Sequence, residues 1–221
     1  MSRILRSTDI KSALRSRQRG FLLNPFRFGS AAITYNSFQA SPVPGGTTSG
    51  TLSNSNRTWT TNTPVGSGNL NANYVTPIGS VASGKKAYWE MQVTQLSPAN
   101  TGYVYFNVHG SYIWYVYGNV RQIVGTNTTN ISAGTNGMRL MFAVDGTAGK
   151  TWYGRDGSWI STGTGTPDPA AGTGPAHTFT PGTGLILIEG RTGTSAQIVT
   201  YNPGNVAFTY TPPTGFSSIN A

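Results

Sequence analysis

Short segments that alternate apolar and polar residues, with turn signals between them, are the feature that most constrains this fold. Residues 89–94 and 103–108 alternate in this way, and residues 140–144 end at the pair Asp145-Gly146. A period of two residues is typical of half-buried β-strands, and Asp-Gly is a strong hairpin signal. Strands at this spacing predict an all-β protein, a two-sheet antiparallel β-sandwich.

Further strands are expected along the rest of the sequence, at residues 113–117, 151–153, 185–188, 198–201 and 206–210. The run 185–188 is apolar throughout, which favours a central strand. Residues 125–137 and 163–182 are rich in glycine and are expected to form loops. Trp89, Trp152 and Trp159 supply large apolar areas for a core.

The C-terminal end predicts where the last strand stops. Pro212 and Pro213 cannot continue a hydrogen-bonded ladder, so the strand over 206–210 is expected to end before them. Gly215 then permits a turn that returns Phe216 to the body of the domain. Phe216 is therefore expected to be buried in the core.

Composition argues against catalysis. The chain has no cysteine, two histidines and six acidic residues, and only 10% of its residues are charged. Disulfides and thiolate metal sites are excluded, and general acid–base chemistry is poorly supplied. No G-x-S-x-G, H-E-x-x-H or phosphate-loop motif occurs. We therefore expect no enzymatic activity, no cofactor and no metal site.

Asp145 and Asp156 are the one candidate for a pair of catalytic carboxylates. Glycosidases need two carboxylates at a defined separation across a sugar-binding cleft. Both residues, however, begin Asp-Gly turn dipeptides. We expect each to bond its own turn backbone, as Asp commonly does in turns.

Positive charge is concentrated at the N-terminus. Residues 1–30 contain seven basic residues and Asp9, a net charge of +6, whereas residues 31–221 carry +3. No apolar run of about 18 residues is present, so no membrane insertion is expected. Basic residues interrupt the stretch 10–19, which argues against a cleaved signal peptide.

This basic segment is expected to be an arm that orders on a partner. Ser7 or Thr8 can cap a short helix that runs to about Arg19, with Asp9 in its first turn and Gly20 as a stop. Such a short helix is marginal alone in water. The organisation predicted is an arm over 1–30, a linker over 31–51 and a sandwich over 52–221. The candidate docking residues are basic and apolar side chains of the arm: Arg3, Arg6, Lys11, Leu14, Arg15, Arg17, Arg19, Phe21, Leu22, Phe26, Arg27 and Phe28.

Three segments of the body resemble the SPRY domain, most closely the version found in bacteriophage virion proteins. The first is G-K-K-A-Y-W-E at 84–90, which has one Lys more than the family form. The second, at 145–159, matches D-x-x-x-G-K-x-W-x-x-x-x-G-x-W, with Asp156 where relatives often have Asn. The third, at 202–216, matches N-x-G-x-x-x-F-x-Y-x-P-P-x-G-F.

The resemblance covers about residues 52–219 and leaves out the arm. It implies a SPRY/concanavalin-like jelly roll, a sandwich that presents its partner-binding surface mainly through variable loops. The Gly-rich segments 125–137 and 163–182 occupy the places of such loops. Fold resemblance does not specify a ligand.

A dense group of aromatic residues lies in the middle of the chain: Tyr103, Tyr105, Tyr112, Trp114 and Tyr117. Exposed Tyr and Trp faces stack on sugar rings or anchor protein interfaces. The alternative is structural, with alternate members in the core and the others at an edge or a subunit contact. We favour the structural interpretation and keep the group as possible ligand or interface residues.

These features together favour a non-enzymatic structural protein of a bacteriophage virion. The arm would bind other virion proteins, and the sandwich would serve decoration, adhesion or host attachment as a tail or capsid accessory. A homo-oligomer is expected, because repetition multiplies a weak contact. Alternatives are a cellular SPRY module that binds a peptide, and a receptor-recognition protein that binds a host glycan. The arm could also contact phosphates of nucleic acid, which its interleaved apolar residues make the weaker interpretation.

Overall fold

The computed structural model describes Phe38 and residues 50–61, 73–78, 81, 83–96, 103–109, 111–115, 121–124, 129–182, 186–191 and 195–220. The chain separates into two units, Met1–Ile33 and Thr34–Ala221, and every described residue belongs to the second. The expected arm and its short helix lie outside the described residues, so they stay predictions. A search of the described residues found no helix long and apolar enough to cross a membrane.

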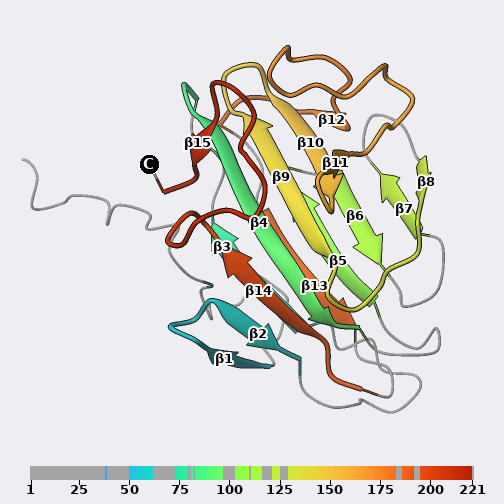
Figure 1. The fold of residues 1–221 in the computed structure, drawn as a ribbon, viewed down its shortest axis with the longest axis vertical. Coiled ribbons are helices and arrows are strands. Elements are labelled where there is room, and N and C mark those ends of the chain that lie inside the picture. The colour runs from blue at the N-terminus through green and yellow to red at the C-terminus, as the bar shows by residue number, and fades with distance from the viewer. Residues whose placement is uncertain are drawn as a thin grey trace, which may run out of the picture. The chain divides into compact units, whose positions relative to one another are not determined.

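The larger of two sheets contains nine strands (Figure 1). Its path runs in the order β1-β2-β14-β4-β9-β10-β11, with β12 beside β10 and β15 beside β4. The strands are β1 (Thr51–Ser53), β2 (Thr58–Thr60), β4 (Lys86–Gln95), β9 (Arg139–Asp145), β10 (Lys150–Arg155), β11 (Ser158–Trp159), β12 (His177–Thr178), β14 (Ile198–Asn202) and β15 (Ser217–Ser218).

The second sheet contains six strands in the order β3-β13-β5-β6-β7-β8. They are β3 (Asn73–Ile78), β5 (Tyr103–Val108), β6 (Ser111–Tyr115), β7 (Arg121–Val124), β8 (Thr129–Ile131) and β13 (Ile186–Arg191). β13 has a neighbour on each side, as its apolar run predicted. All the strand pairs of both sheets are antiparallel except the two-residue pair of β15 with β4.

The two sheets enclose one apolar core. Phe106 of β5 packs against Phe142 of β9, with ring centroids 5.7 Å apart. Trp89 of β4 stacks on Phe142, with ring centroids 5.2 Å apart and an angle of 3° between the ring planes. The hydroxyl of Tyr153 on β10 donates to the carbonyl of Ser111 on β6, at 3.0 Å. Contacts from both sheets within one buried cluster confirm the predicted all-β, two-sheet antiparallel sandwich.

A second apolar cluster lies on the opposite face of the larger sheet. Tyr88, Met141, Ala143 and Trp152 are buried there, and Phe208, Tyr210 and Phe216 of the C-terminal segment pack against them. Phe216 meets Trp152 edge to face at 6.2 Å. The prediction that Phe216 is buried is therefore confirmed, but its site is this outer cluster and not the space between the sheets. Ile219, three residues later, joins the inner core instead.

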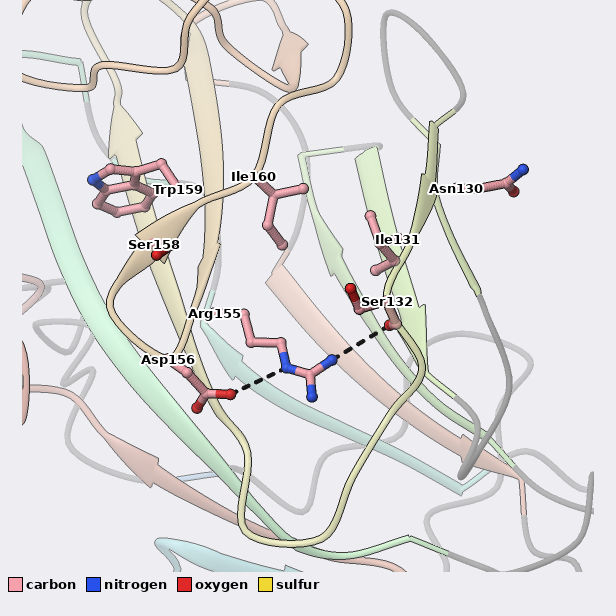
Figure 2. Close-up of a pocket in the computed structure, with 8 residues that line it drawn as sticks. All are labelled: Asn130, Ile131, Ser132, Arg155, Asp156, Ser158, Trp159 and Ile160. Carbon is pink, nitrogen blue, oxygen red and sulfur yellow. Dashed lines mark hydrogen bonds and ion pairs between the residues drawn. The ribbon is translucent and has the colours of Figure 1, made fainter.

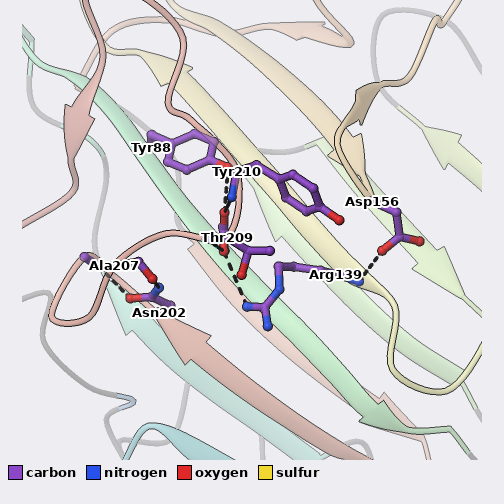
Figure 3. Close-up of polar contacts among 9 residues, drawn as sticks. Tyr88, Arg139, Asp156, Asn202, Ala207, Thr209 and Tyr210 are labelled. Carbon is purple, nitrogen blue, oxygen red and sulfur yellow. Dashed lines mark hydrogen bonds and ion pairs between the residues drawn. The ribbon is translucent and has the colours of Figure 1, made fainter.

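A buried carboxylate fastens the C-terminal segment to the sheet; Figure 3 labels its partners Tyr88, Arg139, Thr209 and Tyr210. Glu90 of β4 is fully buried, and its Oε1 accepts hydrogen bonds from the Tyr88 hydroxyl at 3.0 Å and the Tyr210 amide at 2.8 Å. Its Oε2 accepts from the Thr209 amide at 3.0 Å and from Arg139 Nη1 at 3.4 Å. Burial and the nearby Glu90 charge raise the pKa of Tyr88 above its usual range.

The carboxylate explains why one predicted strand is absent. Residues 206–210 form no strand, and that prediction was wrong. The amides of Thr209 and Tyr210 are bonded to a side chain and not to a neighbouring strand. The Gly215 turn is as predicted, since Gly215 has φ 84° and Phe216 N donates to the Pro213 carbonyl at 2.9 Å, whereas Pro212 and Pro213 have no strand to end.

The two Asp-Gly turns differ in what their carboxylates do. Asp145 Oδ1 accepts from the amides of Thr147 and Ala148 at 2.9 and 2.8 Å, as predicted. Burial opposes ionisation of Asp145, but these amides and Lys86 outweigh it and lower its pKa. Asp156 departs from the prediction: its Oδ1 accepts from the Arg139 amide at 2.8 Å, so it joins two strand ends.

Other expected boundaries also shift. The segment 125–137 contains strand β8, and 163–182 contains β12, so neither is wholly loop. Of the strand expected over 113–117, residues 113–115 belong to β6, and residues 116 and 117 lie outside the described residues. Trp89 and Trp152 are buried as predicted, whereas Trp159 is only half-buried, at the rim of the outer cluster.

Candidate functional site

A groove of about 510 Å³ lies where the edges of the two sheets approach each other (Figure 2). One wall is β8 and the residue that follows it, and the other is the hairpin of β10 and β11. The lining residues are Asn130, Ile131 and Ser132 on the first wall, and Arg155, Asp156, Ser158, Trp159 and Ile160 on the second. The groove is therefore built by both sheets, although its two walls are about 25 residues apart in sequence.

Arg155 joins the two walls. Its Nη1 donates to the Ala133 carbonyl at 2.6 Å, and its Nη2 donates to the Thr135 hydroxyl at 2.9 Å. Its Nε donates to Asp156 Oδ2 at 3.1 Å. Figure 2 shows the guanidinium spanning the space between the hairpin and Ser132. Because its donors are engaged with the protein, Arg155 acts as a fastener that fixes the width of the groove.

The groove combines apolar side chains with hydroxyl and amide groups. Ile131 and Ile160 supply apolar surface, while Ser132, Ser158 and Asn130 supply donors and acceptors. Its single carboxylate, Asp156, is held by the Arg139 amide and by Arg155. Such a lining suits binding of a polar chain, and it brings together no nucleophile with a base. In the part of the chain that the structure describes, no three His, Asp or Glu side chains group as a metal site would require.

Both walls are edge strands. β8 ends the order of the six-stranded sheet, and β11 ends the path of the nine-stranded sheet. Edge strands carry backbone N–H and C=O groups that no neighbouring strand has paired, and extended peptides bind by adding to such edges. The groove thus places its lining side chains beside the terminal strands of both sheets.

The predicted aromatic residues fall on two neighbouring strands. Tyr103 and Tyr105 belong to β5, and Tyr112 and Trp114 belong to β6. In the register of these strands Tyr105 is paired with Trp114. Between them in sequence, Val104, Phe106 and Ile113 are buried in the inner core. The ligand or interface role of the aromatic group stays a prediction, and Tyr117 lies outside the described residues.

None of the predicted site residues that the structure describes lines the groove. The twelve docking residues of the arm, from Arg3 to Phe28, lie outside the described residues. Sequence reasoning missed Arg155 and the β8 wall, because no motif marks a strand inside a Gly-rich segment. It also missed Glu90 as a fastener, because the alternation over 89–94 places Glu90 among the polar residues of the strand.

The two histidines, 68 positions apart in sequence, meet in the fold. His109 is buried, has φ 54°, and stacks on Phe179 at a centroid distance of 4.0 Å. Its Nε2 accepts from the Val81 amide at 3.2 Å. Burial lowers the pKa of His177, and a hydrogen bond with the backbone of His109 opposes that shift. These contacts give both histidines structural roles beside strand β12.

The lowered pKa of His177 predicts that acid destabilises the domain. A histidine whose folded pKa lies below 6.5 binds protons more readily when unfolded. Its contribution is therefore present above pH 6.5 and is lost as the pH falls through the folded pKa. Denaturant unfolding at pH 7.5 and pH 5 should show lower stability at pH 5, above the range in which Asp145 titrates. His177→Asn should reduce this difference in stability between the two pH values. An unchanged difference would show that protonation of His177 does not cause it.

Comparisons with known proteins were made for sequence and for structure. No protein-family model matches the chain, and no curated protein sequence matches it. Among solved structures, the SPRY domain of human HERC1 matches at TM-score 0.44 and 11% identity, over 72% of this chain and 94% of that chain. The PSpry domain of TRIM65 matches at TM-score 0.41 and 11% identity, over 75% of this chain and 87% of that chain. A sialidase matches at 0.40 and 8%, over 66% of this chain and 14% of that chain.

Proposed function

We propose that this chain is a non-enzymatic structural protein of a bacteriophage virion, held to the particle by its N-terminal arm. The carrying observation is the separation of charge: residues 1–30 hold +6 of the formal +9, on a body with few charged residues. An arm that orders on contact couples binding to assembly. The virion-type SPRY motifs at 84–90, 145–159 and 202–216 support the same assignment.

The body, in this proposal, is a display module. One face of its larger sheet packs on the inner core, and the other carries the C-terminal segment. Edges and loops supply surface for attachment. A host glycan or host protein bound there, and association with further copies of the chain, belong to the proposal.

A second candidate function is peptide binding by a SPRY-type interaction module that has no role in a particle. The observation that favours it is the groove between β8 and the β10–β11 hairpin, which Arg155 holds open between two edge strands. An extended peptide fits such a place because peptides can bind by adding a strand to the edge of a sheet. This function requires no arm.

Deleting residues 1–30 tests the anchoring role. We expect the shortened protein to keep its thermal unfolding midpoint, since the described residues of the two buried clusters all follow the arm in sequence. Incorporation into particles should fall about ten-fold or more, equivalent to roughly 1.4 kcal/mol of lost binding. The measurement is the amount of the protein per purified particle.

A charge variant separates the arm's charge from its apolar residues. Arg15, Arg17 and Arg19 are changed to Gln together, and the apolar side chains of the arm are kept. Reduced incorporation with weaker salt dependence would assign attachment to charge. Wild-type incorporation of the deletion variant would overturn the anchoring role and leave the groove as the surface to test.

A further inference from the structure

A pocket of about 250 Å³ lies on the outer face of the larger sheet. The turn between β1 and β2 forms one side of it, and the C-terminal segment after β14 forms the other. Its floor comes from β14, β4 and β9. The residues that matter for its chemistry are Arg57, Gln92, Arg139, Thr200, Asn202 and Thr209.

The strand register places these polar residues in one row. Thr58 of β2 is paired with Thr200 of β14, and Thr200 is paired with Gln92 of β4. Gln92 is in turn paired with Arg139 of β9. Paired residues on one face of an antiparallel sheet are direct neighbours. Arg57, next to Thr58, stands at one end of the row, and Arg139 stands at the other.

Several donors in this pocket are open to a ligand. The Thr58 and Thr200 hydroxyls bond to each other at 3.1 Å. Arg57 makes one weak bond, from Nε to the Asn54 carbonyl at 3.4 Å, and among the described residues its terminal nitrogens have no partner. The side-chain amide of Gln92 likewise has no partner among the described residues. The pocket therefore presents guanidinium and amide N–H groups that have no partner among the described residues.

Arg139 is oriented by the buried carboxylate. Its Nη1 lies 3.4 Å from Glu90 Oε2, and its side chain is 21% exposed. Figure 3 shows its guanidinium beside Thr209, over β4. Because Glu90 also accepts three other hydrogen bonds, it leaves the pocket no free carboxylate. No other acidic residue lines the pocket, so its two arginines give it net positive charge.

The turn that carries Arg57 has an unusual backbone. Asn54, Ser55 and Asn56 have φ values of 53°, 55° and 58°, three left-handed residues in succession. Left-handed residues normally occur singly, and such strain gathers at binding and switching sites. The Phe38 amide bonds to the Asn56 carbonyl at 2.7 Å and helps to hold this conformation.

We propose that this pocket binds the oxyanion of a ligand, a carboxylate or a phosphate group, between Arg57 and Arg139. Guanidinium groups match the geometry of both anions and form charge-assisted hydrogen bonds with them. Gln92 and Thr209 add neutral donors, which suit hydroxyl or carbonyl groups beside the anion. Val206, 57% exposed on the rim, offers apolar contact to the remainder of a larger ligand. The proposal does not depend on the arm or on a virion.

The test is a titration of the full-length protein, observed by NMR, with inorganic phosphate and with glucuronate at constant ionic strength. Saturable shifts of the Gln92, Thr200 and Thr209 amides are expected with at least one anion. Arg57→Gln should weaken the binding about ten-fold or more. Lys150→Gln, which removes the same charge outside the pocket, should leave it unchanged.

The outcomes separate the sources of the anion. Tighter binding of glucuronate identifies a sugar acid or related carboxylate, and tighter binding of phosphate identifies a phosphoryl group. Arg57→Gln is the primary variant because Arg139→Gln would also disturb Glu90. Shifts that fail to saturate with both anions, or that are equal in wild type, Arg57→Gln and Lys150→Gln, would overturn the proposal.

Discussion

Glu90→Gln is expected to destabilise the domain by about 3 kcal/mol, because a buried charge-assisted network loses an acceptor. Each carboxylate oxygen accepts from one backbone amide, Tyr210 at Oε1 and Thr209 at Oε2. A glutamine presents one oxygen and one NH₂ group. In either orientation, one of the two amides then faces a donor. For a domain of this size the thermal midpoint should fall by roughly 6–12 °C.

The comparison variant is Asp168→Asn, the same chemical change at an exposed site. Asp168 Oδ1 accepts from the Ala171 amide at 3.1 Å, and an asparagine oxygen can keep that bond. Its effect should stay within about 0.5 kcal/mol. Equal stability of the two variants in denaturant unfolding would show that Glu90 does not fasten the C-terminal segment.

Gly149→Ala is the second substitution with a large expected effect. Gly149 has φ 62°, and a Cβ atom there would lie 2.0 Å from the carbonyl oxygen of Phe179. The two backbones cannot separate freely, since the Phe179 amide donates to the Gly149 carbonyl at 2.8 Å. Left-handed strain of about 1–2 kcal/mol and overpacking of about 1–3 kcal/mol give an expected loss of roughly 3 kcal/mol.

Gly163→Ala separates strain from collision. Gly163 has φ 81°, and a Cβ atom there would meet nothing within 4 Å. This variant should lose only about 1 kcal/mol. Thermal or denaturant unfolding of both proteins measures the difference. Losses of the same size would mean that the Phe179 carbonyl moves aside and that residues 177–179 are not fixed against β10.

Local patterns predicted the sandwich because its strands carry their own signals. The alternation in β4, β5 and β9, the Asp145 turn and the Gly215 turn each depend on neighbours in sequence, and each is found in the fold. The strand predicted over 206–210 is absent for the opposite reason, since its amides depend on a residue that is distant in sequence. The apolar pattern of these residues is that of a strand, but their amides are satisfied by Glu90, which lies about 120 positions earlier.

Less of the candidate sites was predictable. Nothing near Arg155 in the sequence indicates that its guanidinium spans to Ala133 and Thr135, because that contact depends on how two sheet edges meet. The row from Thr58 to Arg139 likewise exists only once four strands are in register. For the arm, by contrast, the sequence shows the positive charge, and the role of that charge stays a proposal.

Cross-linking in intact particles tests that proposal most directly. Lys11 is the single lysine of the arm, and Lys86 and Lys150 lie on the sandwich. An amine-reactive cross-linker applied to purified particles should join Lys11 to another particle protein, more often than it joins Lys86 or Lys150 to the same protein. Absence of the chain from the particles, or cross-links of Lys11 only within its own chain, would contradict the account.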